Sequence, residues 1–524
     1  MKDSFTFSQV AKIATGVLLV AIVLLIVGTT ASTDSLTSFI IAAGIIGLVA
    51  TILLGRKIWW LLILSSLFYT RNSFLMIIQS GGASLIVLPF MGALAVLGRI
   101  KLKWNKYWPL DLLILALFAI YIQSVVRHPV GFLFSEGNYV GGKGYILFLV
   151  AALSYVANSL ILTDRKELCH LARWCFVAIL IFSIVIPAFY SVLVSPDDIS
   201  YSLEEGDERK RYSGLQRPAQ WAITLMLCRY SWTELLTSFW RLPLVLGSLV
   251  MILVSGFRVT FVENGLLVVL IQWFRKKIWS TLILFAGCFA VLVVFSESGV
   301  LKEKAFPGVQ RSLAVFPFIK IEDHVRADAK DSKEWRIRMW KLATQRHIIR
   351  DEIWGDGLAY ERSKFQRRQT EKWRAQYHRD PKTLGSRDYN LLRYLEGGGW
   401  HNSYLECIQR IGYVGCAVCV PLVACMVFIL YRACKSMLTQ RESFIFMSIF
   451  LYTLAIVLGD WLFSVGTLFN ISMAIPQVGF AKLVYVTALR EGLIEPLWSR
   501  QQYVPLLMRE NARALPQVSG HLDK

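Results

Sequence analysis

The sequence predicts an all-α, polytopic membrane protein with about 12–14 transmembrane helices and one large, mainly helical loop domain outside the membrane. Hydrophobic residues make up 55% of the 524 residues, whereas charged residues make up only 18% and occur in clusters. The apolar runs are about 20 residues long, which is the length a helix needs to cross the hydrocarbon core. They lack the alternation of barrel strands, so helices are the way to satisfy every backbone polar group in lipid.

The first apolar run, residues 11–28, is too long for the core of a signal peptide and ends without a small-residue cleavage site. We therefore expect it to be the first membrane helix. Segments near 58–98 and 218–256 are short or contain polar residues, so the number of membrane helices could be twelve. The expected segments lie near 10–29, 37–54, 58–78, 84–98, 109–127, 145–162, 172–194, 218–237, 242–256, 259–274, 278–296, 408–431, 443–465 and 467–488.

The charges of the loops indicate an orientation. If the N-terminus is cytoplasmic, the loops that follow even-numbered segments are cytoplasmic, and these carry the basic clusters, for example Arg56–Lys57 and Arg275 to Lys277. The loop at 29–35, on the other side, has no Lys or Arg. This distribution follows the positive-inside rule. It predicts cytoplasmic N- and C-termini and places the long loops 195–217 and 297–403 on the outer face.

Four regions follow from this threading: N-terminal transmembrane helices (1–296), an extracytoplasmic loop domain (297–403), C-terminal transmembrane helices (404–489) and a cytoplasmic tail (490–524). The loop domain contains 22 Lys/Arg against 15 Asp/Glu, a net charge of +7. Its residues 332–350 predict an amphipathic helix with Asp331 or Ser332 as N-cap. The sequence Gly355-Asp356-Gly357 predicts a turn that breaks this helix.

The net charge of the whole chain is +20. On a membrane protein, basic loops on the cytoplasmic side account for this charge, so we expect no nucleic-acid partner. Cys416 and Cys419 form a CxxC inside an apolar run, where packing is the expected role. The loop domain contains no cysteine, and Asp323-His324 has no second histidine nearby at ligand spacing, so we expect no metal site there.

Three stretches place arginine or histidine at the expected outer membrane surface. An arginine there is costly without a partner, and guanidinium groups bind phosphate oxygens through paired hydrogen bonds. Several arginines facing one outer cavity favour a diphosphate ligand, and a histidine at its mouth could act as general base near neutral pH. The candidates are Arg211 and Arg217 before a helix, Arg258 between two apolar segments, and Arg336, Trp340, His401 and Asn402 in the loop domain.

Each candidate also has a simpler structural explanation. Arg211 and Arg217 could pair with the acidic run 204–208. Arg258 could extend to the membrane surface, and Arg336 could be a solvated helix charge. His401 could cap its own helix. The residues alone leave these alternatives open.

Taken in order, the motifs resemble the O-antigen ligase and polymerase superfamily over roughly residues 205–431. The shared features are a basic RxxG…PxQxA entry to a helix, an SxxR junction, a long outer loop with RxxxW and GDG, and an HNSY sequence before a glycine-bearing helix. In this chain they are Arg211 to Ala222, Ser255 to Arg258, Arg336 to Trp340, Gly355 to Gly357, His401 to Tyr404, and Gly412 with Gly415. Gln220 and Phe257 depart from the Asn and Ser that are commoner in the family.

The resemblance implies a glycosyltransferase of the bacterial inner membrane that needs no metal, nucleotide or other cofactor. Its donor would be a glycan on undecaprenyl diphosphate, and its acceptor a sugar hydroxyl on lipid A–core, on another lipid-linked repeat or on a protein. Arg211, Arg258 and Arg217 would hold the diphosphate, and Arg336 would approach it from the loop side. His401 would take the proton from the acceptor hydroxyl, while Trp340 and Asn402 would contact substrate.

Two other classes of function compete with this one. A transporter of a small or anionic solute would be favoured if Asp460 and Glu263 faced a central cavity, although no inverted repeat is visible. A membrane scaffold with a binding loop would tolerate the loss of His401. The sequence does not separate a ligase from a polymerase.

Overall fold

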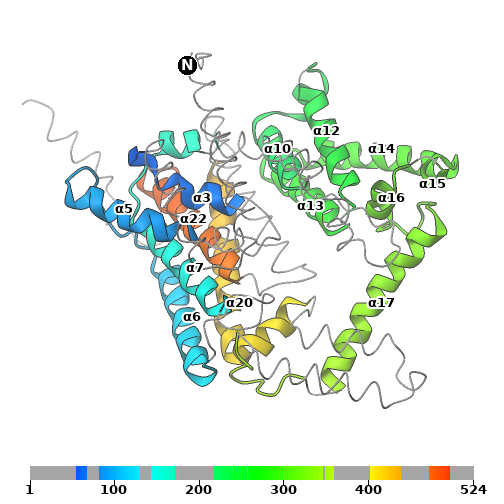
Figure 1. Ribbon diagram of the computed structural model, residues 1–524. Coiled ribbons are helices and arrows are strands. Elements are labelled where there is room, and N and C mark those ends of the chain that lie inside the picture. The colour runs from blue at the N-terminus through cyan, green and yellow to red at the C-terminus, as the bar shows by residue number, and fades with distance from the viewer. Residues whose placement is uncertain are drawn as a thin grey trace, which may run out of the picture.

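In the computed structural model every regular element is helical, and the described residues contain no strand (Figure 1). The all-α expectation is therefore confirmed for this part of the chain. The structure describes residues 55–67, 82–129, 143–171, 174, 216–239, 241–256, 258–303, 305–345, 348–358, 402–437 and 471–495.

Three helices in the described part of the chain are long and apolar enough to cross a membrane: α6 (Trp108–Arg127), α14 (Ile278–Glu297) and residues 404–433 of α20 (Ser403–Met437). Apolar but shorter helices accompany them. These are α5 (Ser84–Val96), α7 (Lys143–Leu160), α12 (Arg241–Val254) and α13 (Arg258–Phe274). Many of the expected segments fall wholly or partly outside the described residues, for example 10–29 and 172–194.

One bundle contains α5, α6, α7 and α20 together with α3 (Trp60–Leu67) and α22 (Ile471–Arg490), beside the 3-10 turn η1 (Gly55–Lys57). In Figure 1 it occupies the left half, with α7 lying along α22 and α6 along α20. Gly479 of α22 allows the close contact with α7, since a Cβ there would lie 3.2 Å from the Cα of Tyr155. Small residues of this kind let membrane helices approach closely.

A buried ion pair joins three helices of this bundle. Lys482 of α22 is completely buried, and its Nζ lies 2.5 Å from Oδ1 of Asp111 in α6 and 2.8 Å from Oγ of Ser159 in α7. The hydroxyl of Tyr155 donates to the same Asp111 oxygen at 2.8 Å. Removing charges from water is costly, and these hydrogen bonds offset that cost.

A second group of helices occupies the upper right of Figure 1. It meets the bundle where the ring of Phe274 in α13 lies 5.6 Å from that of Tyr431 in α20. The expected single segment at 218–237 is wrong, because Ser231 caps a new helix through a capping box with Glu234. The group comprises α12, α13, α14, α10 (Gln216–Arg229), α11 (Trp232–Leu236), α15 (Val300–Glu303) and α16 (Pro307–Leu313).

Within residues 297–403, where a loop domain is expected, one long helix, α17, spans Asp323–Gln345. The expected helix was 332–350, so α17 both starts and ends earlier than expected. The predicted N-cap at Asp331 or Ser332 is therefore wrong. No glycine or proline interrupts residues 323–331, and the helix therefore continues through them. In Figure 1, α17 runs from the second group toward the level at which α20 begins.

Helix α20 is broken at Gly412, whose φ of 68° and ψ of −173° are not helical. Residues before and after this break form two helical pieces that differ in direction, as Figure 1 shows. Such a break needs partners for the backbone groups it releases.

We predict that Lys482→Met lowers the free energy of unfolding by about 3–5 kcal/mol, because it leaves the Asp111 carboxylate buried without its cation. Thermal unfolding of purified protein in detergent measures the effect. Lys320→Met is the matched control, since Lys320 pairs with Glu297 at 2.5 Å on the exposed surface, where a pair is worth at most about 1 kcal/mol. Equal shifts in the two variants would contradict the assignment.

Candidate functional site

The structure describes the side chains of four of the seven predicted site residues: Arg258, Arg336, Trp340 and Asn402. Of Arg217 only the backbone is described, within the first turn of α10. His401 and Arg211 lie outside the described residues, and their predicted roles stay predictions.

Arg258 and Arg336 are brought together although 78 positions separate them in the sequence. Arg258 is the first residue of α13, directly after the turn in which Gly256 adopts a φ of 73°. Its Nη1 donates to the carbonyl oxygen of Ala329 in α17 at 3.2 Å. Arg336 lies seven residues further along α17, which is about two helical turns.

The electrostatic surroundings of Arg336 reflect this proximity. Burial lowers the pKa of its guanidinium below the ordinary value, and the guanidinium of Arg258 lowers that pKa further. An arginine stays protonated at any physiological pH. The two cations therefore repel each other in a partly buried place, and an anion between them would relieve the repulsion.

A third arginine, which no motif in the sequence indicates, lies near this junction. Arg311 of α16 is buried, and its Cδ would lie 3.8 Å from a Cβ on Gly256. Gly308 packs so closely on the end of α12 that a Cβ there would be 2.3 Å from the Val254 carbonyl oxygen. No spacing in the sequence predicts this position of Arg311, because only the packing of α16 on α12 brings it to the turn before Arg258.

Trp340 packs inside a small apolar cluster. The cluster is built on Met339 and Ala343 of α17, and Leu405 from the first turn of α20 packs against it. Trp340 therefore has a packing role, and its cluster joins the end of α17 to the start of α20. The contact of Trp340 with a substrate stays a prediction. The other partly buried members are Trp335, Leu342, Ile348 and Ile349.

Asn402 caps α20. Its side-chain Oδ1 accepts hydrogen bonds from the backbone N–H groups of Tyr404 at 3.0 Å and Leu405 at 3.1 Å. This is the capping alternative that the sequence analysis considered for the neighbouring His401. Contact of Asn402 with a substrate stays a prediction.

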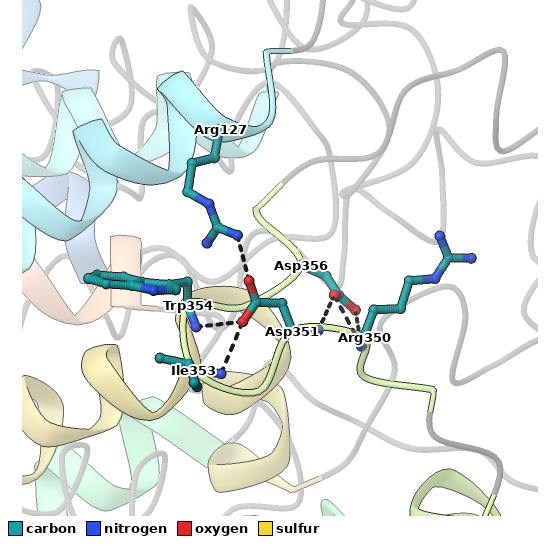
Figure 2. A network of polar contacts seen from close by, with 6 residues as sticks. All are labelled: Arg127, Arg350, Asp351, Ile353, Trp354 and Asp356. Atoms are coloured by element: carbon teal, nitrogen blue, oxygen red, sulfur yellow. Dashed lines mark hydrogen bonds and ion pairs between the residues drawn. The ribbon is translucent and has the colours of Figure 1, made fainter.

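Residues 350–358, here called the strap, contain the predicted Gly355–Gly357 turn, and two carboxylates organise them (Figure 2). Asp351 accepts hydrogen bonds from the N–H groups of Ile353 at 3.1 Å and Trp354 at 2.9 Å, and it forms an ion pair with Arg127 of α6 at 2.5 Å. Asp356 accepts from the N–H groups of Arg350 and Asp351. The strap is thereby folded on itself and attached to the end of α6.

The backbone of the strap fills the break in α20. In an unbroken helix the N–H groups of residues 413 and 414 would bond to the carbonyls of residues 409 and 410. Instead, the Tyr413 and Val414 N–H groups donate to strap carbonyls of Glu352 at 2.8 Å and Ile353 at 3.1 Å. The released carbonyls of Gln409 and Arg410 accept from strap N–H groups at 2.6 and 3.2 Å. All four groups are thus satisfied.

Three glycines make this close approach possible. Gly355, Gly357 and Gly412 have φ values of 80°, 92° and 68°, which side chains other than glycine rarely adopt. A Cβ on Gly355 would lie 2.5 Å from the Arg410 carbonyl, and one on Gly412 would lie 2.0 Å from the Ile353 carbonyl oxygen. The predicted turn at Gly355–Gly357 is present, but it does not end the helix, because α17 already ends at Gln345. The surface against which the turn packs was not predicted.

Two buried charged residues in the first piece of α20 were also missed. Glu406 and Arg410 lie one helical turn apart, and at most 2% of either residue is exposed to solvent. Arg410 lies close enough to Tyr121 of α6 and Tyr145 of α7 to interact with both electrostatically. The spacing of a glutamate and an arginine in an otherwise apolar stretch is the signal that could have found them.

We predict that Gly355→Ala destabilises the strap far more than Gly98→Ala destabilises its own turn. Both glycines have positive φ, but a Cβ on Gly98 meets nothing within 4 Å. Both variants therefore bear the conformational cost, and only Gly355→Ala adds a clash, worth about 1–3 kcal/mol. Limited proteolysis between residues 348 and 358 together with thermal unfolding measures the difference. Equal behaviour of the two variants would mean that the strap is not seated in the break.

We further predict an acid-dependent loosening of the strap. The Trp354 N–H group and Arg127 lower the pKa of Asp351 below its ordinary value of 3.8. A depressed pKa stabilises the fold above the unfolded-state value, and the contribution is lost as pH falls through the folded-state value. Hydrogen exchange of the strap, corrected for intrinsic rates, should hold steady from neutral pH to about 4 and rise below it. Asp351→Asn should exchange fast at every pH, whereas Glu297→Gln should leave the strap unchanged.

The described residues contain no group of three or more His, Cys, Asp or Glu side chains that could hold a metal ion. Comparison with models of known protein families finds no match, and a search of curated protein sequences finds no relative. The resemblance noted in the sequence therefore stands on its motifs and their order, and the arrangement of the arginines is the structural observation that bears on function.

Proposed function

We propose that this protein is a membrane glycosyltransferase, either a ligase or a polymerase, of cell-surface polysaccharide biosynthesis. It would move a glycan from undecaprenyl diphosphate to a sugar hydroxyl, without a metal. The single observation that carries the proposal is the approach of Arg258 and Arg336. These residues belong to segments that are remote in sequence, and the charge of each guanidinium group disfavours the charged form of the other.

A diphosphate would suit this pair of arginines. Guanidinium groups form paired, charge-assisted hydrogen bonds with phosphate oxygens. The leaving diphosphate gains negative charge as the glycosidic bond breaks, and cations that are already in position stabilise that charge most in the transition state. The bond of Arg258 to the Ala329 carbonyl and the partial burial of Arg336 hold the two side chains in place before a substrate arrives.

The acceptor side of the reaction would lie at the start of α20. Trp340 is one helical turn from Arg336, and its cluster contacts Leu405. Asn402 caps that helix, and His401 precedes it in the chain. In the proposed mechanism His401 takes the proton from the acceptor hydroxyl, whose oxygen attacks the anomeric carbon, and a single displacement inverts that carbon. Arg211 and Arg217 would add to the diphosphate site.

The proposal includes a location in the bacterial inner membrane, with cytoplasmic termini and a periplasmic loop domain. The charge distribution of the loops supports that orientation. A glycan donor and acceptor on the outer leaflet would then meet at the side where α17, the strap and the start of α20 gather. The net charge of +7 over 297–403 suits an anionic lipid or glycan.

The test measures glycan transfer in membranes from a host that lacks the native gene. We expect Arg258→Ala and Arg336→Ala each to lower transfer from an undecaprenyl-diphosphate-linked glycan at least about 10²-fold, the usual loss when a charge-stabilising donor is removed. His401→Ala should abolish it. The matched control is Arg338→Ala, which removes an exposed arginine from the same helix. A membrane blot must show equal amounts of every variant.

The pattern of products separates the remaining classes. Acceptor capped with a single repeat in the variants indicates a polymerase, whereas bare acceptor with free lipid-linked polymer indicates a ligase. Normal transfer in Arg258→Ala, Arg336→Ala and His401→Ala would refute the transferase hypothesis and favour the transporter or the scaffold. Solute flux that changes in Arg336→Ala while surface glycan stays normal would identify the transporter.

A further inference from the structure

A cluster of basic and aromatic residues lies at one end of the second helix group and has no part in the proposed chemistry. Two stretches, 229–241 and 273–281, form it where α10 and α13 end and where α12 and α14 begin. They carry five basic residues against one acidic residue, a net charge of +4. The five basic residues, here called the basic patch, are Arg229, Arg241, Arg275, Lys276 and Lys277.

Tyr230 brings three of these arginines together from three helix ends. The Arg241 guanidinium lies over the Tyr230 ring, 3.9 Å from its centroid, and Arg229 Nε donates to the Tyr230 hydroxyl at 3.0 Å. Arg275 Nη1 donates to the carbonyl oxygens of Leu227 at 2.5 Å and Tyr230 at 2.7 Å. The cations thus lie close together although the sequence separates them.

The positive charge of the patch is not balanced within these two stretches. Carbonyl oxygens and a tyrosine ring hold Arg275 and Arg241 in place, but they are neutral groups and leave the positive charge. The one acidic residue, Glu234, belongs to the capping box of α11, where its Oε2 accepts from the Ser231 N–H group at 2.8 Å. A single carboxylate cannot offset five cations, and the patch therefore attracts anions.

The position of the patch along the helices places it at a membrane surface. Helix α14 is long and apolar enough to cross a membrane, and it begins at Ile278, directly after Lys277. Helix α13 separates the patch from Arg258 by about 24 Å, most of the roughly 30 Å of a hydrocarbon core. The patch and the arginine pair of the candidate site therefore lie toward opposite faces of the membrane.

Two tryptophans flank the basic turn between α13 and α14. Trp273 is 64% exposed and Trp279 is 76% exposed, and Lys276 and Lys277 between them are exposed as well. Tryptophan is enriched where a helix meets the headgroup layer, because its ring is apolar and its N–H group polar. Cations beside such rings fit a partner that has both a phosphate group and acyl chains, whereas free phosphate would use the cations alone.

We propose that the basic patch binds the headgroup of an anionic phospholipid in the leaflet opposite the candidate site, which the loop charges predict to be the cytoplasmic leaflet. The guanidinium and ammonium groups would contact the phosphate, and Trp273 and Trp279 would pack against the upper part of the acyl chains. This site is separate from the proposed transferase site, and the inference does not depend on that function.

The experiment uses the full-length protein in phosphatidylcholine nanodiscs that contain a trace of phosphatidylglycerol with a photoreactive group in its headgroup. We expect cross-links to concentrate on residues 229–241 and 273–281. Excess phosphatidylglycerol should displace them, whereas an equal amount of zwitterionic phosphatidylethanolamine should not. Excess glycerol phosphate should not displace them either, because it carries the charged group without the acyl chains.

A double variant and a matched control test the role of charge. Lys276→Gln with Lys277→Gln should lower these cross-links about 25-fold, since each basic residue near a membrane surface changes affinity about fivefold. Lys330→Gln with Lys333→Gln removes two exposed lysines from α17 and should change nothing. If the first variant fails to accumulate, wild-type protein at about 1 M salt replaces it, because screening at that concentration should lower the labelling.

Each result either supports or overturns the inference. Labelling of the two stretches that phosphatidylglycerol alone displaces, and that the lysine substitutions reduce, supports it. Cross-links spread evenly over other helix ends, displacement by phosphatidylethanolamine, or labelling that neither the substitutions nor salt reduce would overturn it. Displacement by glycerol phosphate would identify a site for soluble phosphate and also overturn it. None of these results depends on glycan transfer, so the proposed function is tested separately.

Discussion

The exchange of backbone hydrogen bonds between the strap and α20 is the constraint on which the rest of the structure depends. A helix that breaks in an apolar environment exposes N–H and carbonyl groups, each costly to leave without a partner. Here Gln409, Arg410, Tyr413 and Val414 find those partners in another segment of the chain. The break and the strap are therefore stable only together, and glycines at the points of contact allow the approach.

This exchange connects the strap, and through it α17, to the helical bundle that contains α6 and α20. The strap follows α17 in the chain, and Asp351 fastens it to Arg127 at the end of α6 (Figure 2). The position of α17 is fixed at its other end by the bond between Arg258 and Ala329. With both ends held, α17 spans from the second helix group toward the start of α20, and Arg336 and Trp340 occupy defined places along it.

The charged side chains inside the protein divide into two kinds. Lys482 and Asp111 satisfy each other, with Tyr155 and Ser159 completing the set, and this arrangement joins three helices. Arg258 and Arg336, in contrast, carry the same charge and approach each other at a partly buried junction. Opposite charges stabilise each other, whereas like charges that lie close together attract an anion, and this attraction is the basis of the proposed diphosphate site. This difference is the reason that the proposed function is built on the arginines and not on the buried pair.

The sequence by itself determined the helical class, the apolar segments and the turns between them. The junction before Arg258 and the turn at Gly355–Gly357 were predicted because glycine and helical periodicity are local properties. The long helix of the loop domain was predicted with wrong ends, since helix-forming residues extend it to Asp323 and packing decides where it stops. Only the tertiary structure decided that Arg258 meets α17, that Arg311 lies beside Gly256, that the strap enters the break at Gly412, and that Glu406 and Arg410 are buried. These contacts join segments that are remote in the chain, and no local pattern of hydrophobicity or charge specifies which backbone group will satisfy another.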